Sequence, residues 1–193
     1  SLASGNAELQ RELSRRSLDW SSGFAPEEFV VTNGCIEAVN LCLRAVTKPG
    51  DTVAIESPAY FGVLQAIESQ GLKALEIPTS PREGISLEAL AMALSTRRIK
   101  ACIVVATVSN PLGSVMPDAH KERLVALCER RNVALIEDDT YSELLDMDTP
   151  PRAIKSWDRS GNVIHCASLH KILAPGLRLG WISTGRWHSR VEM

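Results

Sequence analysis

The sequence lacks long hydrophobic runs, clusters of like charge and closely spaced cysteine pairs, and only 5% of its 193 residues are aromatic. Its apolar stretches, such as Ala101–Thr107, are far shorter than the roughly 20 residues that a membrane-spanning helix needs. The N-terminus has neither the basic nor the apolar region of a secretory signal. These absences predict a soluble protein that is neither secreted nor embedded in a membrane.

Positive and negative charges nearly balance, because the chain has 21 Lys and Arg residues and 23 Asp and Glu residues, with a formal net charge of −2. A sequence without a block of like charge argues against direct binding to nucleic acid or to a membrane surface. The five cysteines are odd in number and sit mostly within apolar patterns, which indicates small buried side chains in a reduced, cytoplasmic setting. His165 and His170 have no cysteine or carboxylate at ligand spacing, and we predict no metal site.

Five short, nearly continuous apolar runs recur along the chain. Strands that are buried on both faces have this pattern, whereas strands with one solvent-exposed face alternate. The expected strands are Thr52–Glu56, Ala101–Thr107, Val133–Glu137, Asn162–Ala167 and Leu179–Thr184.

Segments with helical periodicity alternate with these strands. Ser86 stands where it can cap the third expected helix, and Pro117 suits the start of the fourth. Alternating strands and helices predict a single α/β domain with a three-layer, mostly parallel sheet and helices on both faces. The expected helices cover residues 36–46, 59–69 and 87–96 and a segment that follows Pro117.

Polar residues follow three of the strands, where ligands bind in open α/β sheets. Asn110 comes after the second strand, Asp138 and Tyr141 after the third, and Lys171 after the fourth. An amide, a carboxylate, a phenol and an amine are therefore expected to meet at one edge of the sheet. Seven residues after Lys171, in a segment bent by proline and glycine, we expect Arg178 to return to the same edge.

Five motifs follow one another in order: VTNGCIEAVNL, ESPAYFGVLQ, SNPLGSVMPD, ALIEDDTYSEL and ASLHKILAPGLRLGWIS. Over about residues 5 to 187 the chain thereby resembles class I/II pyridoxal-phosphate-dependent aminotransferases of fold type I. Within that group it resembles most the aminotransferase-like domain of MocR-type regulators in the GntR family. The resemblance implies a partial large domain over residues 1–193, pyridoxal 5′-phosphate as cofactor, and an N-terminal segment and small C-terminal domain outside the chain.

The resemblance gives the strand-end residues roles around the cofactor ring. Lys171 is implied to be the catalytic lysine that holds the cofactor as a Schiff base. Asp138 is implied to keep the ring nitrogen protonated, so that the ring can accept electrons. We prefer it to the adjacent Asp139 because the family places this aspartate three residues before the tyrosine. Asn110 and Tyr141 are implied to contact the ring's phenolic oxygen.

The phosphate group requires hydrogen-bond donors, and the resemblance places three sets of them. Gly34-Cys35-Ile36 begins a helix and would offer backbone N–H groups. Ser168 and Arg178 would add a hydroxyl and a guanidinium, although a sheet-edge salt bridge is an alternative for Arg178. Tyr60 would stack on the ring, the alternative being packing between a helix and the sheet.

The chain departs from the family pattern at two places. Where relatives have a small residue followed by Gln, it has Cys35 and Ile36, which weakens any side-chain hydrogen bond to the phosphate. Where relatives have Ser or Thr before the lysine, it has His170. This histidine either removes a phosphate-binding hydroxyl or supplies a titratable neighbour.

Three functions fit these residues. The first is the effector-sensing domain of a MocR-type regulator, which binds DNA only through a domain outside this chain, and the wording of SNPLGSVMPD and IEDDTYSEL favours it. The second is part of a free-standing aminotransferase, and the third is a structural remnant that binds no cofactor. The first two imply a homodimer that binds an amino acid or amino compound, and we do not expect turnover by these 193 residues alone.

Overall fold

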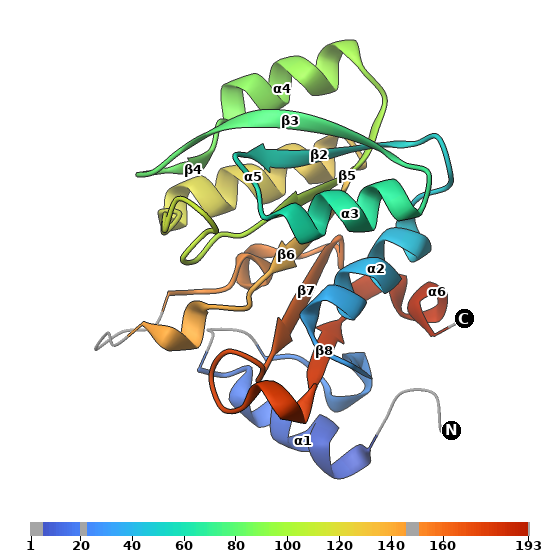
Figure 1. Ribbon diagram of the computed structural model, residues 1–193, viewed down its shortest axis with the longest axis vertical. Helices are drawn as coiled ribbons and strands as arrows, with labels where there is room; N and C mark the ends of the chain where they lie inside the picture. Colours follow the sequence, from blue (N-terminus) through green and yellow to red (C-terminus); the bar gives the residue numbers. More distant parts are fainter. Residues whose placement is uncertain (1–5, 20–22, 146–150, 193) are drawn as a thin grey trace.

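The computed structural model describes residues 6–19, 23–145 and 151–192 and is built around an eight-stranded sheet of order β1-β8-β7-β6-β5-β2-β3-β4 (Figure 1). The strands turn steadily from β8 to β3, which is the usual twist of an open sheet. Their bounds are β1 Phe29–Thr32, β2 Thr52–Ser57, β3 Lys73–Ser80, β4 Gly84–Ile85, β5 Ile99–Val104, β6 Ala134–Asp138, β7 Val163–Ser168 and β8 Gly180–Ser183.

The sheet is parallel in its middle and antiparallel at its edges. β3, β2, β5, β6 and β7 pair in parallel in that order. β8 runs antiparallel to both β7 and β1, and the short β4 runs antiparallel to β3. All five expected strands are present, but the expected Ala101–Thr107 strand lies two to three residues earlier, as β5.

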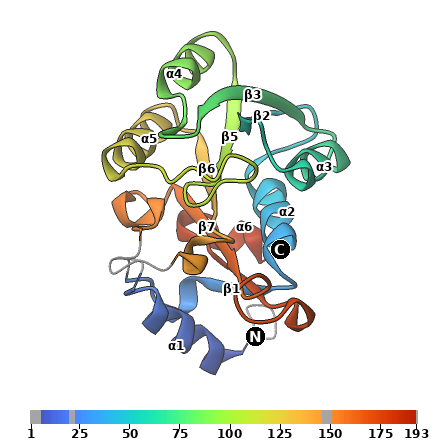
Figure 2. The same cartoon turned by 60° about the vertical axis from the view of Figure 1, so that its left-hand side comes forward.

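Helices cover both faces of the sheet, as expected (Figure 2). α2 and α3, with the short α6, pack on one face, and α4 and α5 pack on the other. Ser86 caps α4, since its Oγ accepts a hydrogen bond from the Ala89 N–H at 3.2 Å. The helices are α1 Ala7–Arg16, α2 Cys35–Val46, α3 Phe61–Ser69, α4 Leu87–Thr96, α5 Asp118–Arg130 and α6 His188–Val191.

Burial on both faces explains the continuous apolar runs. In β5, Ala101 and Ile103 pack toward α2 and α3, while Cys102 and Val104 pack toward α4 and α5. Since successive side chains of a strand point to opposite faces, every position of such a strand must be apolar. The predicted α/β class is confirmed, and the sheet is mixed.

Some elements differ from the sequence-based expectation. β1, β3, β4 and α1 were not expected: β1 and β4 have only four and two residues, and β3 and α1 are largely exposed and lack a continuous apolar run. α3 begins at Phe61, two residues later than expected, because Tyr60 has an extended backbone and precedes the first turn. In the ranges that the structure describes, no helix combines the length and apolar character needed to cross a membrane.

Candidate functional site

A cavity of about 260 Å³ opens at the carboxyl ends of β5, β6 and β7, beside the start of α2. Residues from six separate segments of the chain line it, and every site residue expected from the sequence is among them. Val105, Thr140 and His170 line it as well. The expected residues that it brings together are Gly34, Cys35, Ile36, Tyr60, Asn110, Asp138, Tyr141, Ser168, Lys171 and Arg178.

Asp138 is the last residue of β6 and presents its half-buried carboxyl group to the cavity. Its Oδ1 accepts hydrogen bonds from Thr140 Oγ1 at 2.6 Å and from Cys35 Sγ at 3.1 Å. Loss of water around the carboxyl raises its pKa, and these two donors partly offset that rise. Asp138 therefore brings a carboxyl group that is held by two donors to the cavity.

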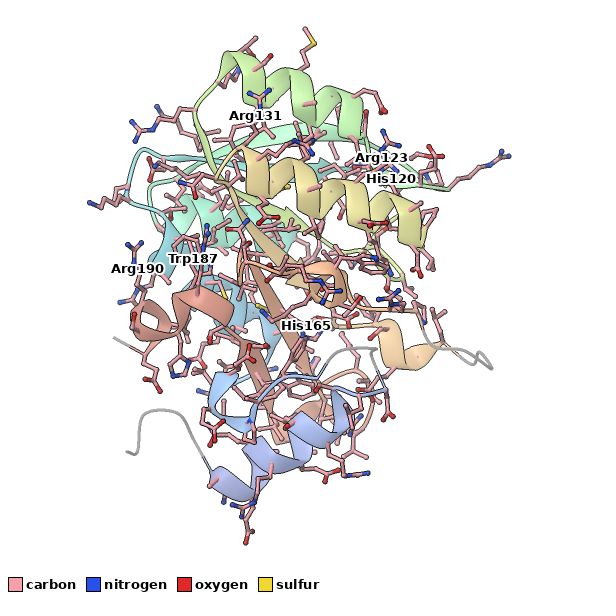
Figure 3. The ribbon with its side chains drawn as sticks, turned by 180° about the vertical axis from the view of Figure 1, so that it is seen from behind. His120, Arg123, Arg131, His165, Trp187 and Arg190 are labelled. Atoms are coloured by element: carbon pink, nitrogen blue, oxygen red, sulfur yellow. The ribbon has the colours of Figure 1, made fainter. Side chains whose placement is uncertain are left out.

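The neighbouring Asp139 faces the other side of the sheet. Its Oδ2 lies 3.1 Å from His165 Nε2, and both side chains are buried. Figure 3 labels His165 in the interior of the molecule. Burial opposes a charge on His165, yet its hydrogen bond to Asp139 and the nearby Glu137 carboxyl raise the pKa of this histidine. The preference for Asp138 over Asp139 thus agrees with the geometry.

Arg178 has a left-handed backbone, with φ of 49°, and its guanidinium lies over the start of α2. Nη2 donates to the Asn33 carbonyl at 2.9 Å, and Nη1 lies 3.2 Å from His170 Nδ1. A Cβ atom on Gly34 would lie 3.1 Å from Arg178 Nη2, so glycine at this position leaves room for the guanidinium. Arg178 thus contacts a carbonyl and an imidazole at the cavity rather than forming the alternative sheet-edge salt bridge.

Ser168 ends β7 at the bottom of the cavity and is only 1% exposed. Within the described part of the chain its Oγ has no hydrogen-bond partner. A buried hydroxyl without a partner costs about 1–3 kcal/mol, so this atom favours a polar ligand group. The start of α2 and the Arg178 guanidinium line the same cavity, and a helix N-terminus and a guanidinium both favour an anion.

Tyr60 and Lys171 enter the cavity from different connections. Tyr60 directly precedes α3 and is 39% exposed, which disfavours simple packing between helix and sheet. A Cβ atom on Gly62 would lie 2.4 Å from the Tyr60 ring, so glycine there lets the ring lie across the helix start. Lys171 is exposed and lies in the connection from β7 to β8, next to the β6 strand end that carries Asp138.

Two residues near the cavity were missed from the sequence. Thr140, whose hydroxyl donates to Asp138, belongs to no sequence pattern that would single it out. Glu56 lies near the end of β2, is 5% exposed, and accepts the Val105 N–H through Oε2 at 2.8 Å. Burial raises the pKa of Glu56 to about 7. The sequence signal that could have identified Glu56 was an acidic residue near the end of a largely apolar strand. In the described ranges, no group of three or more His, Cys, Asp or Glu side chains is arranged to hold a metal ion.

The sequence of this chain is similar to those of known proteins. The model of the family "Aminotransferase class I and II" matches residues 3–189. Two Escherichia coli (strain K12) proteins named uncharacterized helix-turn-helix-type transcriptional regulators are similar. YjiR is 44% identical over 98% of this chain and 40% of its own length. YdcR is 46% identical over 99% of this chain and 41% of its own length.

Solved aminotransferase structures share the fold. An archaeal alanine:glyoxylate aminotransferase superposes with a TM-score of 0.92 and 28% identity, over all of this chain and 49% of its own. LysN, an α-aminoadipate aminotransferase from Thermus thermophilus complexed with N-(5′-phosphopyridoxyl)-L-leucine, gives a TM-score of 0.88 and 28% identity, over 98% of this chain and 48% of its own.

The chain spans about two-fifths of the length of the two curated relatives. The resemblance to aminotransferases and to transcriptional regulators that the five motifs indicated is confirmed by these matches, as is the fold. The chain belongs to the aminotransferase class I and II family.

Proposed function

We propose that this chain is the pyridoxal 5′-phosphate-binding, aminotransferase-like part of a MocR-type transcriptional regulator of the GntR family. The observation that carries the proposal is that one cavity is lined by an amine, a carboxylate and an anion-binding guanidinium, from Lys171, Asp138 and Arg178. The phosphopyridoxyl group of the ligand in the LysN complex supports the cofactor, and the names of YjiR and YdcR support the regulator.

The residues around the cavity fit the ring of this cofactor. When bound, it supplies an aldehyde and a ring that accepts electrons. The Lys171 amine would bond to the aldehyde carbon with loss of water, and Asp138 would accept the hydrogen bond of the protonated ring nitrogen. Asn110 and Tyr141 would donate to the phenolic oxygen, and Tyr60 would cover one face of the ring.

A second group of cavity residues would hold the phosphate. The backbone N–H groups of Gly34-Cys35-Ile36 would donate to it, aided by the positive end of the α2 dipole. The unpartnered hydroxyl of Ser168 and the guanidinium of Arg178 would complete its hydrogen bonds. In this proposal Lys171 is the catalytic residue, and the chain is part of the larger cofactor-binding domain.

Lysine labelling tests the proposal. Adding pyridoxal 5′-phosphate to the full-length protein should produce a visible absorbance band, and borohydride should then fix one phosphopyridoxyl group on Lys171, seen by peptide mass spectrometry. Lys171→Ala should lose both band and label, whereas Lys73→Ala, at an exposed position of β3, should keep them. A label on another lysine, or no band at all, would overturn the assignment.

A free-standing aminotransferase is the second candidate, favoured by the close superposition on the archaeal alanine:glyoxylate aminotransferase. Both functions need the same amine, acid and anion site, so the cavity does not separate them. The full reading frame does: a winged-helix segment encoded upstream supports the regulator, which would bind DNA through it, and its absence supports the enzyme. In both cases the small-molecule partner would be an amino acid or amino compound.

We also propose that the protein is a cytoplasmic homodimer. Five free cysteines in the described ranges suit a reducing compartment. Large apolar side chains are exposed at Ile36, which lines the cavity, and at Phe61, Leu173 and Leu177, which are within two residues of cavity residues in the sequence. A second copy that covers them would remove this apolar surface from water. Sedimentation of the full-length protein tests the dimer, and a monomer at micromolar concentration would contradict it.

A further inference from the structure

Two side chains from distant parts of the chain hold the carboxyl group of Asp138. Thr140 lies two residues beyond it, and Cys35 is the first residue of α2, 103 positions away in the sequence. Their donor atoms lie 2.6 Å and 3.1 Å from the same acceptor, Oδ1. Neither of these side-chain contacts involves Oδ2, and the backbone N–H of Thr140 also donates to the carboxyl group. One oxygen is thus held from two directions, and the rotation of the carboxyl group is fixed.

The Cys35 thiol must donate in this contact. Burial, together with the nearby carboxyl of Asp138, raises the pKa of the Cys35 thiol well above its ordinary value, so the sulfur keeps its proton. A protonated thiol is a weak donor, and the acceptor that it reaches in the described part of the chain is Asp138 Oδ1. The Cys35 side chain therefore donates to the carboxyl group of Asp138 and takes no part in the anion site that the neighbouring backbone N–H groups would form.

We propose that Cys35 and Thr140 are positioning residues that turn Asp138 so that Oδ2 faces the ring nitrogen of the bound heterocycle. This inference rests on the function proposed above. It gives the cysteine that departs from the family pattern a role of its own: its backbone N–H would belong to the anion site, and its side chain orients the carboxyl group of Asp138. Cys35 would thereby contribute to both the phosphate subsite, through its backbone, and the ring-nitrogen subsite, through its side chain.

This role of Cys35 predicts a difference between two ligands. 4′-Deoxypyridoxine 5′-phosphate has the ring nitrogen and the phosphate but no aldehyde, so it binds without bonding to Lys171. Inorganic phosphate has only the anion. Loss of the thiol in Cys35→Ala should weaken binding of the first ligand about fivefold and leave phosphate binding unchanged. Thr140→Val, which removes the shorter contact, should weaken it about tenfold.

Isothermal titration calorimetry on the full-length protein measures both affinities. Cys35→Ser, which keeps a donor, should bind both ligands like the wild type, and Cys128→Ala, a buried cysteine of α5 outside the cavity, serves as the matched control. The ring absorbance gives a second measurement. In Cys35→Ala the bound ring nitrogen should lose its proton at a lower pH than in the wild type, and Cys35→Ser should restore the wild-type value.

Each other outcome counts against a specific claim. Equal weakening of both ligands in Cys35→Ala would assign the side chain to the anion site and overturn the inference. Wild-type affinity for the ring ligand and an unchanged ring titration would also overturn it. If the wild-type protein binds phosphate but not the ring ligand, or binds neither, the proposed cofactor site itself is wrong.

Discussion

His170, one of the residues that depart from the family pattern, contacts Arg178, with 3.2 Å between Nδ1 and Nη1. An arginine side chain keeps its proton in proteins, so this contact is favourable only when Nδ1 is the acceptor and the ring proton lies on Nε2. Nδ1 also lies 3.3 Å from the Pro175 carbonyl, which would require the opposite tautomer. We expect the interaction with the charged guanidinium to prevail.

Histidine at this position is therefore expected to orient Arg178 rather than to leave the anion site short of a donor. His170→Ala should weaken binding of inorganic phosphate about fivefold, because Arg178 loses a partner that fixes its guanidinium. His170→Asn, whose amide oxygen can accept from Arg178, should stay near the wild-type affinity. Titration of phosphate checks this, with His120→Asn on α5 as control. Unchanged affinity in His170→Ala would show that Arg178 needs no such support.

At the scale of elements, the sequence predicts best where both faces of a strand are buried. β2, β5, β6, β7 and β8 were expected, because each has apolar residues buried on both faces and leaves a continuous apolar run. β3 was not, since among its eight residues only Ile77 is buried. Polar residues at the carboxyl ends of these strands were likewise found, because strand-end placement has a sequence signal. Thr140 lacks one, because a threonine two residues after an aspartate is not a distinctive pattern, and the role of Glu56 depends on Val105, 49 positions away in the sequence.

β8 holds the start of α2 in place, and the sequence gives no hint of this contact. A Cβ atom on Gly180 would lie 2.6 Å from the carbonyl carbon of Gly34 and 2.9 Å from Thr32 Oγ1. Because these are backbone atoms and a short buried side chain, they cannot turn aside at low cost. The close approach of strand and helix start therefore requires glycine.

Gly180→Ala should push the start of α2 away from β8. We expect the free energy of unfolding to fall by about 1–3 kcal/mol, as in other overpacked sites, and phosphate binding to weaken at the same time. Urea unfolding and phosphate titration measure the two effects. Gly176→Ala is the control, since a Cβ atom there would meet nothing within 4 Å. If Gly180→Ala has wild-type stability and phosphate affinity, β8 accommodates the Cβ atom without displacing the start of α2, and the prediction is wrong.

On the scale of the whole molecule, the sheet separates two sets of buried ionisable groups. Successive residues of β6 point to opposite faces, so Asp138 reaches Cys35 at the start of α2, while Glu137 accepts the N–H groups of Ile154 and Lys155 on the other side. Burial raises the pKa of Glu137 and of Glu56. The pH dependence of folding should therefore reflect carboxyl groups that resist ionisation in the folded protein.

Glu56 allows the clearest test, because its pKa rises from 4.5 to about 7 on folding. Below pH 4.5 it is protonated in both states, and its contribution to stability is fully present. Between pH 4.5 and about 7 only the unfolded chain ionises, so that contribution is lost as the pH rises, by about 3 kcal/mol in total. Glu56→Gln retains an acceptor for the Val105 N–H and has no proton to lose.

The free energy of unfolding of Glu56→Gln should therefore fall less than that of the wild type between pH 5 and pH 8. The stability difference between the two proteins should shift in favour of the variant by about 2–3 kcal/mol over that range. Urea unfolding at several pH values measures it, and Glu122→Gln, at an exposed position of α5, should follow the wild type. Parallel curves for Glu56→Gln and wild type would mean that Glu56 ionises in the folded state as easily as in water, and that solvent reaches the end of β2 through the cavity.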